Sequence, residues 1–180
     1  MWPYAKNLIQ LIISPDHGWE DVATSSSPSR AFKLMTVLLI IAALSPLCRL
    51  LYVDHSSTLL IWQSTVIIFA AYWATFFIGE FTLGMFLPSI SDLEETRSLT
   101  RSFCAYITGL LSLQTILESV IPIPVAILQL WPIYVVVIIW RAMAILEVPE
   151  AHTGKYFIIT IPALILPSQI IIRFFYSTFS

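Results

Sequence analysis

The sequence contains few charged residues, few glycines and few cysteines. Charged side chains make up 11% of the 180 residues, whereas a soluble domain has about 25%. A chain with so few charges cannot cover a soluble globule with water-facing groups. The five glycines include no Gly-x-x-x-Gly spacing that would locate a helix–helix interface. Cys48 and Cys104 fall at opposite ends of their predicted helices, and a disulfide needs Cα atoms within about 7 Å, so we expect none.

The motifs of common catalytic and ligand-binding sites are also missing. The chain has no Gly-rich phosphate loop, no Gly-x-Ser-x-Gly elbow and no His-Glu-x-x-His motif. His17, His55 and His152 stand apart from any second His or Cys at metal-ligand spacing. No basic patch is present, which excludes nucleic acid as a partner. We therefore expect no enzyme, no catalytic residue, no metal and no cofactor.

Five apolar runs fill most of the chain after residue 33. Each has close to the roughly 20 residues that a helix needs to cross a hydrocarbon core of about 30 Å. This pattern predicts an all-α integral membrane protein with a five-helix transmembrane bundle over residues 34–180. Residues 1–33 are predicted to form a cytoplasmic or interfacial N-terminal segment with a short interfacial helix. The predicted spans are 34–53, 57–79, 102–121, 123–143 and 156–176.

Positive charges alternate between the connections of the five predicted spans. Seven of the nine Lys and Arg residues fall on one side and two on the other. Because short cytoplasmic loops carry an excess of Lys and Arg, we expect a cytoplasmic N-terminus and an external C-terminus. The cytoplasmic set is Lys6, Arg30, Lys33, Arg97, Arg101, Arg141 and Lys155, and the external set is Arg49 and Arg173.

The second predicted span belongs to an unusually long apolar stretch. The second apolar stretch continues almost to Ile90, about 50 Å at 1.5 Å per residue, which is more than one crossing needs. We expect the span to end near Gly79 and an interfacial segment to follow over 80–90, with one strongly tilted helix as the alternative.

The prolines in 121–124 predict a tight turn between the third and fourth spans. Pro162 and Pro167 make the fifth helix the one most inclined to bend.

The N-terminal segment divides into two short predicted helices. Residues 4–13 predict a helix lying in the membrane interface. Pro15 to Gly18 predicts a turn, and Trp19 opens a second short helix. The apolar part is too short and interrupted for a cleavable signal peptide, so we expect the first span to act as an uncleaved insertion signal. The simpler interpretation of the segment is a membrane-hugging anchor, and the alternative is a docking surface for a partner.

The Pro-x-x-Gly-Trp-x-x-Val element supplies a resemblance to a known family. It consists of Pro15, Gly18, Trp19 and Val22. Together with the leading helix, the polar linker and five close-set spans, it resembles the YIP domain family of Ypt/Rab-interacting membrane proteins and their prokaryotic relatives. The resemblance implies a five-helix bundle with a cytoplasmic N-terminus. The chain has no Asp-Leu-Tyr-Gly-Pro motif of the eukaryotic members, which implies the prokaryotic branch and the bacterial inner (plasma) membrane.

Charged side chains within the apolar runs are candidate functional residues, because each costs several kcal/mol at the bilayer centre unless paired or hydrated. Arg49 and Glu118 are expected near outer helix ends, and Glu80 and Arg141 near cytoplasmic ends. No charge is expected at the midplane, where a proton-coupled pump would need one. Snorkelling toward the interfaces explains these charges most simply. The sharper hypothesis is two interhelical ion pairs, Arg49–Glu118 and Glu80–Arg141.

Uncharged polar residues gather in the predicted outer half of the membrane. The simpler interpretation is interhelical hydrogen bonding, at about 0.6–2 kcal/mol per bond. The alternative is a polar binding cavity that opens outward. The candidate layer consists of Gln63, Gln114, Gln129 and Gln169.

These observations favour a non-enzymatic membrane protein of YIP-domain type with a scaffold, partner-binding or membrane-organising role. The alternative function is a small transporter or permease subunit that uses the outer polar cavity. The expected partners are the lipid bilayer and either another membrane protein or a second copy of the chain.

Overall fold

The computed structural model describes residues 2–25, 27–51, 58–89, 96–121 and 126–179. The described residues are almost entirely helical and contain no strand, which confirms the all-α prediction. The α-helices are α1 (Trp2–Ile13), α2 (Pro15–Ser25), α3 (Pro28–Leu44), α4 (Thr58–Phe86), α5 (Thr96–Val120), α6 (Trp131–Arg141), α7 (Thr153–Leu164) and α8 (Leu166–Phe179). Short 3₁₀ helices are η1 (Ser45–Leu51), η2 (Leu87–Ser89), η3 (Ala126–Leu130), η4 (Ala142–Ala144) and η5 (Glu150–His152).

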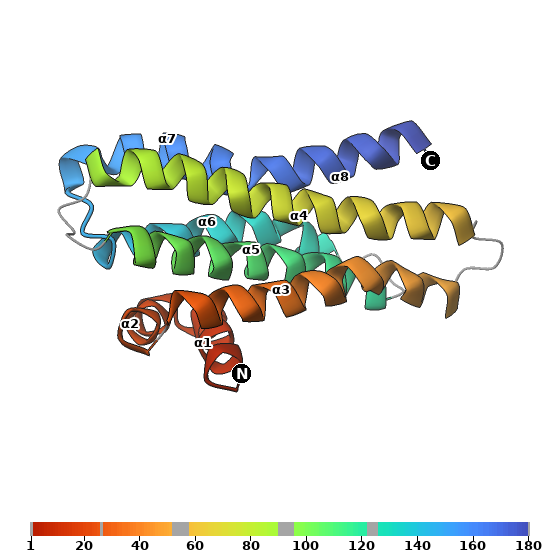
Figure 1. The fold of residues 1–180 in the computed structure, drawn as a ribbon, viewed down its shortest axis with the longest axis horizontal. Helices are drawn as coiled ribbons and strands as arrows, with labels where there is room; N and C mark the ends of the chain where they lie inside the picture. The colour runs from red at the N-terminus through yellow and green to blue at the C-terminus, as the bar shows by residue number, and fades with distance from the viewer. Residues whose placement is uncertain (1, 26, 52–57, 90–95, 122–125, 180) are drawn as a thin grey trace.

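The long helices form an elongated bundle, with α3 to α8 running roughly along its length (Figure 1). Helix α3 packs chiefly against α5, and α4 packs against α5, α7 and α8. Helices α1 and α2 lie to one side, beside the first turns of α3, and α2 also contacts α6. The N-terminal pair therefore packs on the bundle; the sequence predicts its two short helices but not this packing.

Four helical segments are long and apolar enough to cross a membrane: Pro28–Cys48, Leu59–Ser89, Ser98–Val120 and Glu150–Phe175. These segments support a membrane protein. The predicted fourth span corresponds to a shorter apolar segment, Leu128–Ala144, among the described residues. The predicted turn over 121–124 falls mostly outside the described residues. Four candidate spans are thus established, and the fifth remains a prediction.

Helix α4 runs without a break through Gly79 to Phe86 and continues as η2 to Ser89, so the predicted interfacial segment starts as part of the same helix. A Cβ added to Gly79 would lie 2.2 Å from Cδ2 of Leu164, so this glycine lets α7 approach closely rather than ending the helix. Leu83 and Leu87 are buried, and their packing holds the last turns of α4 in helical form. The stretch is therefore one continuous helix, and the end of the membrane crossing near Gly79 stays a prediction.

The last predicted span is divided where its prolines stand. Pro162 lies inside α7, the helix ends at Leu164, and α8 starts at Leu166 with Pro167 in its first turn. A proline inside a helix removes one backbone hydrogen bond and clashes with the carbonyl four residues earlier. Ile165 forms the joint and is itself buried. The sequence predicts a bend in this segment, and the structure has a break between α7 and α8 at these prolines.

Candidate functional site

Trp19 attaches the N-terminal helices to the bundle. It lies on α2, is 2% exposed, and its indole Nε1 donates a hydrogen bond to the carbonyl of Ile138, 2.8 Å away. Its ring lies 5.3 Å from that of Phe103 and meets Tyr106 edge-on at 6.4 Å. Both aromatic partners belong to α5, whereas Ile138 belongs to α6. A single side chain therefore joins α2 to two helices of the bundle.

The acceptor carbonyls lie at the end of α6. This helix ends at Arg141, and the N–H of Ala142 already donates to the carbonyls of Ile138 and Ile139, so a side-chain donor adds a second hydrogen bond to each. Trp19 reaches the carbonyl of Ile138, and the hydroxyl of Tyr156 donates to the next carbonyl, that of Ile139, at 3.0 Å. Side chains from α2 and α7 thus supply donors to the final turn of α6.

Each residue of the Pro-x-x-Gly-Trp-x-x-Val element has a visible structural role. Pro15 is the first residue of α2, a position where the missing N–H of proline costs nothing. A Cβ added to Gly18 would lie 2.7 Å from the backbone N of Leu11, so α1 and α2 cross there in close contact. Val22 is buried one turn after Trp19. The predicted turn over 15–18 is therefore wrong, because proline starts the helix and glycine serves the helix crossing.

Helix α1 is also attached to α6, but here the donor side chain belongs to α6 and the acceptor carbonyl to α1. The hydroxyl of Tyr134, on α6, donates a hydrogen bond to the carbonyl of Ile12 in the last turn of α1. Tyr4, Leu8 and Leu11 are buried, and they form the apolar face that packs on the bundle. The N-terminal segment is consequently part of the hydrophobic core and not a separate tail.

The outward faces of the two N-terminal helices differ in character. On α1, Lys6, Ile9 and Ile13 are exposed at helical spacing, with Ile13 78% exposed. On α2, His17 and Glu20 are exposed and form a pair with Nδ1 to Oε2 at 3.3 Å. Helix α1 thus offers an apolar strip next to one positive charge, and α2 offers a charged surface.

The predicted Glu80–Arg141 ion pair is wrong, because the structure gives each residue a different partner. Glu80 Oε1 lies 3.5 Å from Nε of Arg101, and the Arg101 guanidinium stands 4.9 Å from the centre of the Phe32 ring. Arg141 Nη1 lies 3.4 Å from Oδ1 of Asp16. The docking of α2 beside the end of α6 brings Asp16 to Arg141, and the sequence alone gave no signal for that contact.

The predicted Arg49–Glu118 pair depends on a side chain outside the described residues, that of Arg49. Glu118 accepts a hydrogen bond at its Oε1 from Nε2 of Gln114, at 2.8 Å. The two residues are one turn apart on α5, a spacing that brings side chains together on a helix.

The four glutamines of the predicted polar layer occupy different surroundings. Gln114 is buried and bonded to Glu118 within α5. Gln129 is exposed, and Gln169 is half-buried. Gln63 lies in an apolar surface hollow, whose described lining contains none of the other three glutamines. That lining consists of Trp62, Gln63, Val66, Ile67 and Phe175.

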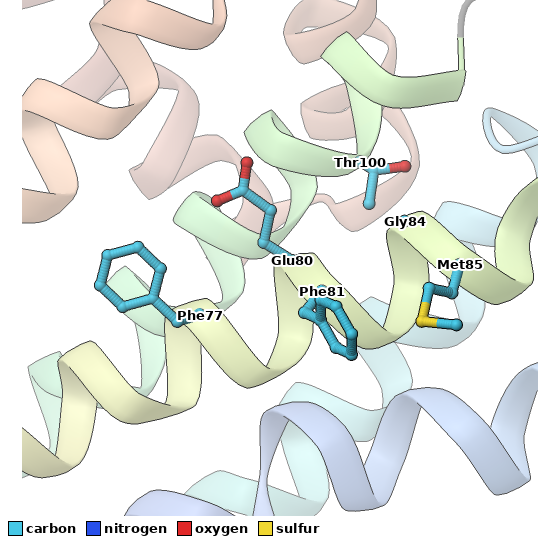
Figure 2. A pocket seen from close by; sticks show the side chains of 6 residues that line it. All are labelled: Phe77, Glu80, Phe81, Gly84, Met85 and Thr100. Carbon is cyan, nitrogen blue, oxygen red and sulfur yellow. The ribbon is translucent and has the colours of Figure 1, made fainter.

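A second hollow, of about 330 Å³, lies on the α4 surface next to the start of α5. Figure 2 shows its side chains, with Phe77, Phe81 and Met85 spread along α4 and Thr100 on α5 near Gly84. Glu80 gives the hollow a carboxylate. Glu80 is one of the charges predicted near a cytoplasmic helix end, but nothing in the sequence predicts a recess at Gly84.

No protein-family model matches the chain, and no match is found among curated proteins or solved structures. Within the described part of the chain, no group of three or more His, Cys, Asp or Glu residues is arranged to hold a metal ion. The role of the protein is therefore inferred from its own contacts.

Proposed function

We propose that the chain is a non-enzymatic multi-pass membrane protein of YIP-domain type that acts as a scaffold for a partner protein. Its N-terminus is cytoplasmic, its C-terminus is external, and five helices cross the bilayer. The observation that carries the proposal is the burial of Trp19 between α5 and α6. It holds α2 in one position, so that the exposed side of α2 forms a fixed docking surface at the end of the bundle.

The grouping of helix ends supports this orientation. The start of α3, the start of α5, the end of α6 and the start of α7 lie at the same end of the bundle as α2 (Figure 1). These ends carry most of the Lys and Arg residues of the chain. Since positive charge is retained on the cytoplasmic side, this end of the bundle is the cytoplasmic one.

The shape of α6 supports a fifth span. Val135, Ile138 and Ile139 are buried against the bundle, while Ile133 and Val137 are exposed on the other side. A helix that is apolar on both its packed and its exposed sides fits a position between protein and lipid. In the proposed arrangement α6 crosses the membrane together with the 3₁₀ turns on either side of it.

The exposed strip of α1 supports contact with the membrane surface. Ile9 and Ile13 have no covering residues in the bundle, and Lys6 stands on the same side of the helix. An amphipathic helix of this kind lies in the plane of the interface, with its apolar residues toward the acyl region and its basic residue toward the phosphates. Helix α1 would then fix the level at which α2 stands above the membrane.

The exposed side of α2 favours a partner with a basic surface. Asp16 and Glu20 both project from it, and their neighbours Arg141 and His17 leave their side chains more than half exposed. Exposed charge of this kind steers association more than it stabilises a fold. The transporter alternative lacks this support, because Gln129 is exposed and Gln63 lies in an apolar hollow apart from the other glutamines.

Site-specific photocrosslinking in native membranes tests the scaffold role. A photoreactive amino acid at position 20 should give a discrete protein adduct, and the same group at position 158, an exposed site on α7, should not. The adduct should disappear when Trp19→Ala releases α2, and it should weaken when Asp16→Lys reverses a charge on the docking surface. Equal adducts at positions 20 and 158 would contradict the proposal.

A further inference from the structure

The hollow beside Glu80 is a recess created by a glycine. It is bounded by side chains of α4 and by Thr100 of α5. A Cβ added to Gly84 would meet no atom within 4 Å, so the space above this glycine is open. Phe77, Phe81 and Met85 stand four residues apart along the same helix and are all exposed, with Phe81 71% exposed. The recess is thus open on its outer side and bordered by apolar side chains.

Glu80 lines this recess and pairs with Arg101 of α5, whose guanidinium also stands 4.9 Å from the centre of the Phe32 ring. Glu80 and Arg101 touch through Oε1 and Nε at 3.5 Å, and their side chains are 32% and 45% exposed. The contact uses one nitrogen of the guanidinium, not the two parallel bonds that Arg and a carboxylate can form. A ligand with one negative and one positive group can therefore bind both residues without separating them.

The Glu80–Arg101 pair lies at the depth in the bundle that lipid headgroups would occupy. From Leu59 to Glu80 the rise along α4 is about 32 Å, and from Arg101 to Val120 the rise along α5 is about 29 Å, at 1.5 Å per residue. Both values are close to the roughly 30 Å thickness of a hydrocarbon core. If the outer ends of α4 and α5 lie at one interface, the Glu80–Arg101 pair lies at the other.

We propose that this hollow binds one phospholipid with an ethanolamine headgroup from the cytoplasmic leaflet. The headgroup ammonium donates hydrogen bonds to the Glu80 carboxylate, and the phosphate accepts from the Arg101 guanidinium. The headgroup fills the recess over Gly84, on the cytoplasmic side of Glu80, the glycerol region lies beside Phe81, and an acyl chain follows Phe77 toward the bilayer centre. This inference rests on the proposed membrane topology.

The carboxylate of Glu80 is the reason to expect an ethanolamine headgroup and not an anionic or a choline headgroup. A purely anionic headgroup would be repelled by Glu80, which lines the hollow. A quaternary choline headgroup has no N–H with which to bond a carboxylate. An ethanolamine headgroup has both a phosphate and three N–H donors, and charge-assisted hydrogen bonds are stronger than neutral ones.

Native mass spectrometry of the full chain in detergent tests the proposal with three added probes: dioleoyl phosphatidylethanolamine, phosphatidylglycerol and phosphatidylcholine. We expect one retained molecule of the ethanolamine lipid in preference to the other two. Glu80→Gln should weaken this binding about tenfold or more, the usual effect of losing a charged hydrogen-bond partner. Gly84→Leu should abolish it by filling the recess.

Gly154→Leu is the matched control, because a Cβ at this second helical glycine also meets nothing within 4 Å. It should retain lipid like the unmodified chain. Equal retention of all three lipids, unchanged binding by Gly84→Leu, or a lipid-free dimer that Gly84→Leu dissociates would each overturn the inference. Alkaline extraction of membranes separates the two proposals: release of the chain contradicts the membrane topology, whereas retention without lipid selectivity contradicts only this site.

Discussion

The indole of Trp19 donates its hydrogen bond to the backbone carbonyl of Ile138, although 119 residues separate the two in the chain. The contact connects the second helix of the N-terminal segment to the last turn of α6. It explains why a motif in the first 25 residues belongs to the core of the bundle. Its loss should affect the stability of the bundle and the position of α2 together.

Replacing Trp19 should therefore destabilise the protein strongly. Trp19→Ala should lower the free energy of unfolding by about 3–5 kcal/mol, the usual cost of truncating a buried large aromatic residue. Trp19→Phe keeps much of the packing but removes the indole donor of the Ile138 carbonyl, which still accepts from the N–H of Ala142, and should cost about 0.5–1.5 kcal/mol. Unfolding by denaturant in detergent micelles measures both values.

Trp62→Ala provides the control for Trp19, because Trp62 is 54% exposed on α4. Exposed substitutions usually change stability by about 0.5 kcal/mol or less. If Trp62→Ala proves as destabilising as Trp19→Ala, the buried anchor is not what holds the N-terminal pair to the bundle.

Gly18→Ala should loosen the contact between α1 and α2. The added Cβ would lie 2.7 Å from the backbone N and 2.8 Å from the Cα of Leu11, and backbone atoms cannot move aside as a side chain can. Gly154→Ala should be neutral or stabilising by up to about 1 kcal/mol, because its surroundings are open and alanine favours a helix. Limited proteolysis of the N-terminal segment should become faster only in Gly18→Ala. Equal protease resistance of the two variants would contradict the close crossing.

Gly79 and Leu164 should be energetically coupled. Gly79→Ala places a Cβ 2.2 Å from Cδ2 of Leu164, a buried side chain, and such overpacking costs about 1–3 kcal/mol. In the background of Leu164→Ala the same substitution should cost much less, since the space is then free. Thermal unfolding of the single and double variants measures the coupling, and additive effects would mean that α4 and α7 are not in contact at Gly79.

The charge at Glu80 should couple to Arg101 and not to Arg141. A double-mutant cycle on Glu80→Gln and Arg101→Gln should give about 0.2–1 kcal/mol, the range for partly exposed pairs. The parallel cycle with Arg141→Gln should give no coupling, because Arg141 pairs with Asp16. Coupling in the cycle with Arg141 alone would contradict the Glu80–Arg101 contact and support the Glu80–Arg141 pair predicted from the sequence.

Helix content, the apolar segments and the break in the last span could be predicted from the sequence, because each depends on local properties. Long apolar runs specify helices in lipid, and Pro162 and Pro167 act on the backbone next to them. The sequence could not show that α4 continues past Gly79, because a length that exceeds one crossing does not indicate where the helix ends. The close approach of Leu164 to Gly79 depends on a distant helix and has no local signal.

The candidate site was less predictable, since it depends on how distant segments meet. The Pro15–Gly18 stretch has the composition of a turn, yet the close crossing at Leu11 and the burial of Trp19 keep it helical. The pairing of Arg141 with Asp16 follows from the same docking. Charge sorting indicates which end of a helix a residue occupies, but it does not indicate which neighbour lies beside it.

Cysteine accessibility tests the proposal that Trp19 docks α2 at the cytoplasmic end of a membrane-spanning bundle. In a background of Cys48→Ala and Cys104→Ala, single substitutions Glu20→Cys and Val22→Cys are exposed to a membrane-impermeant maleimide in intact cells and in inverted vesicles. The account predicts labelling of position 20 in inverted vesicles only, and labelling of position 22 only after Trp19→Ala. Labelling of position 20 in intact cells, or equal labelling of positions 20 and 22 with Trp19 in place, would contradict it.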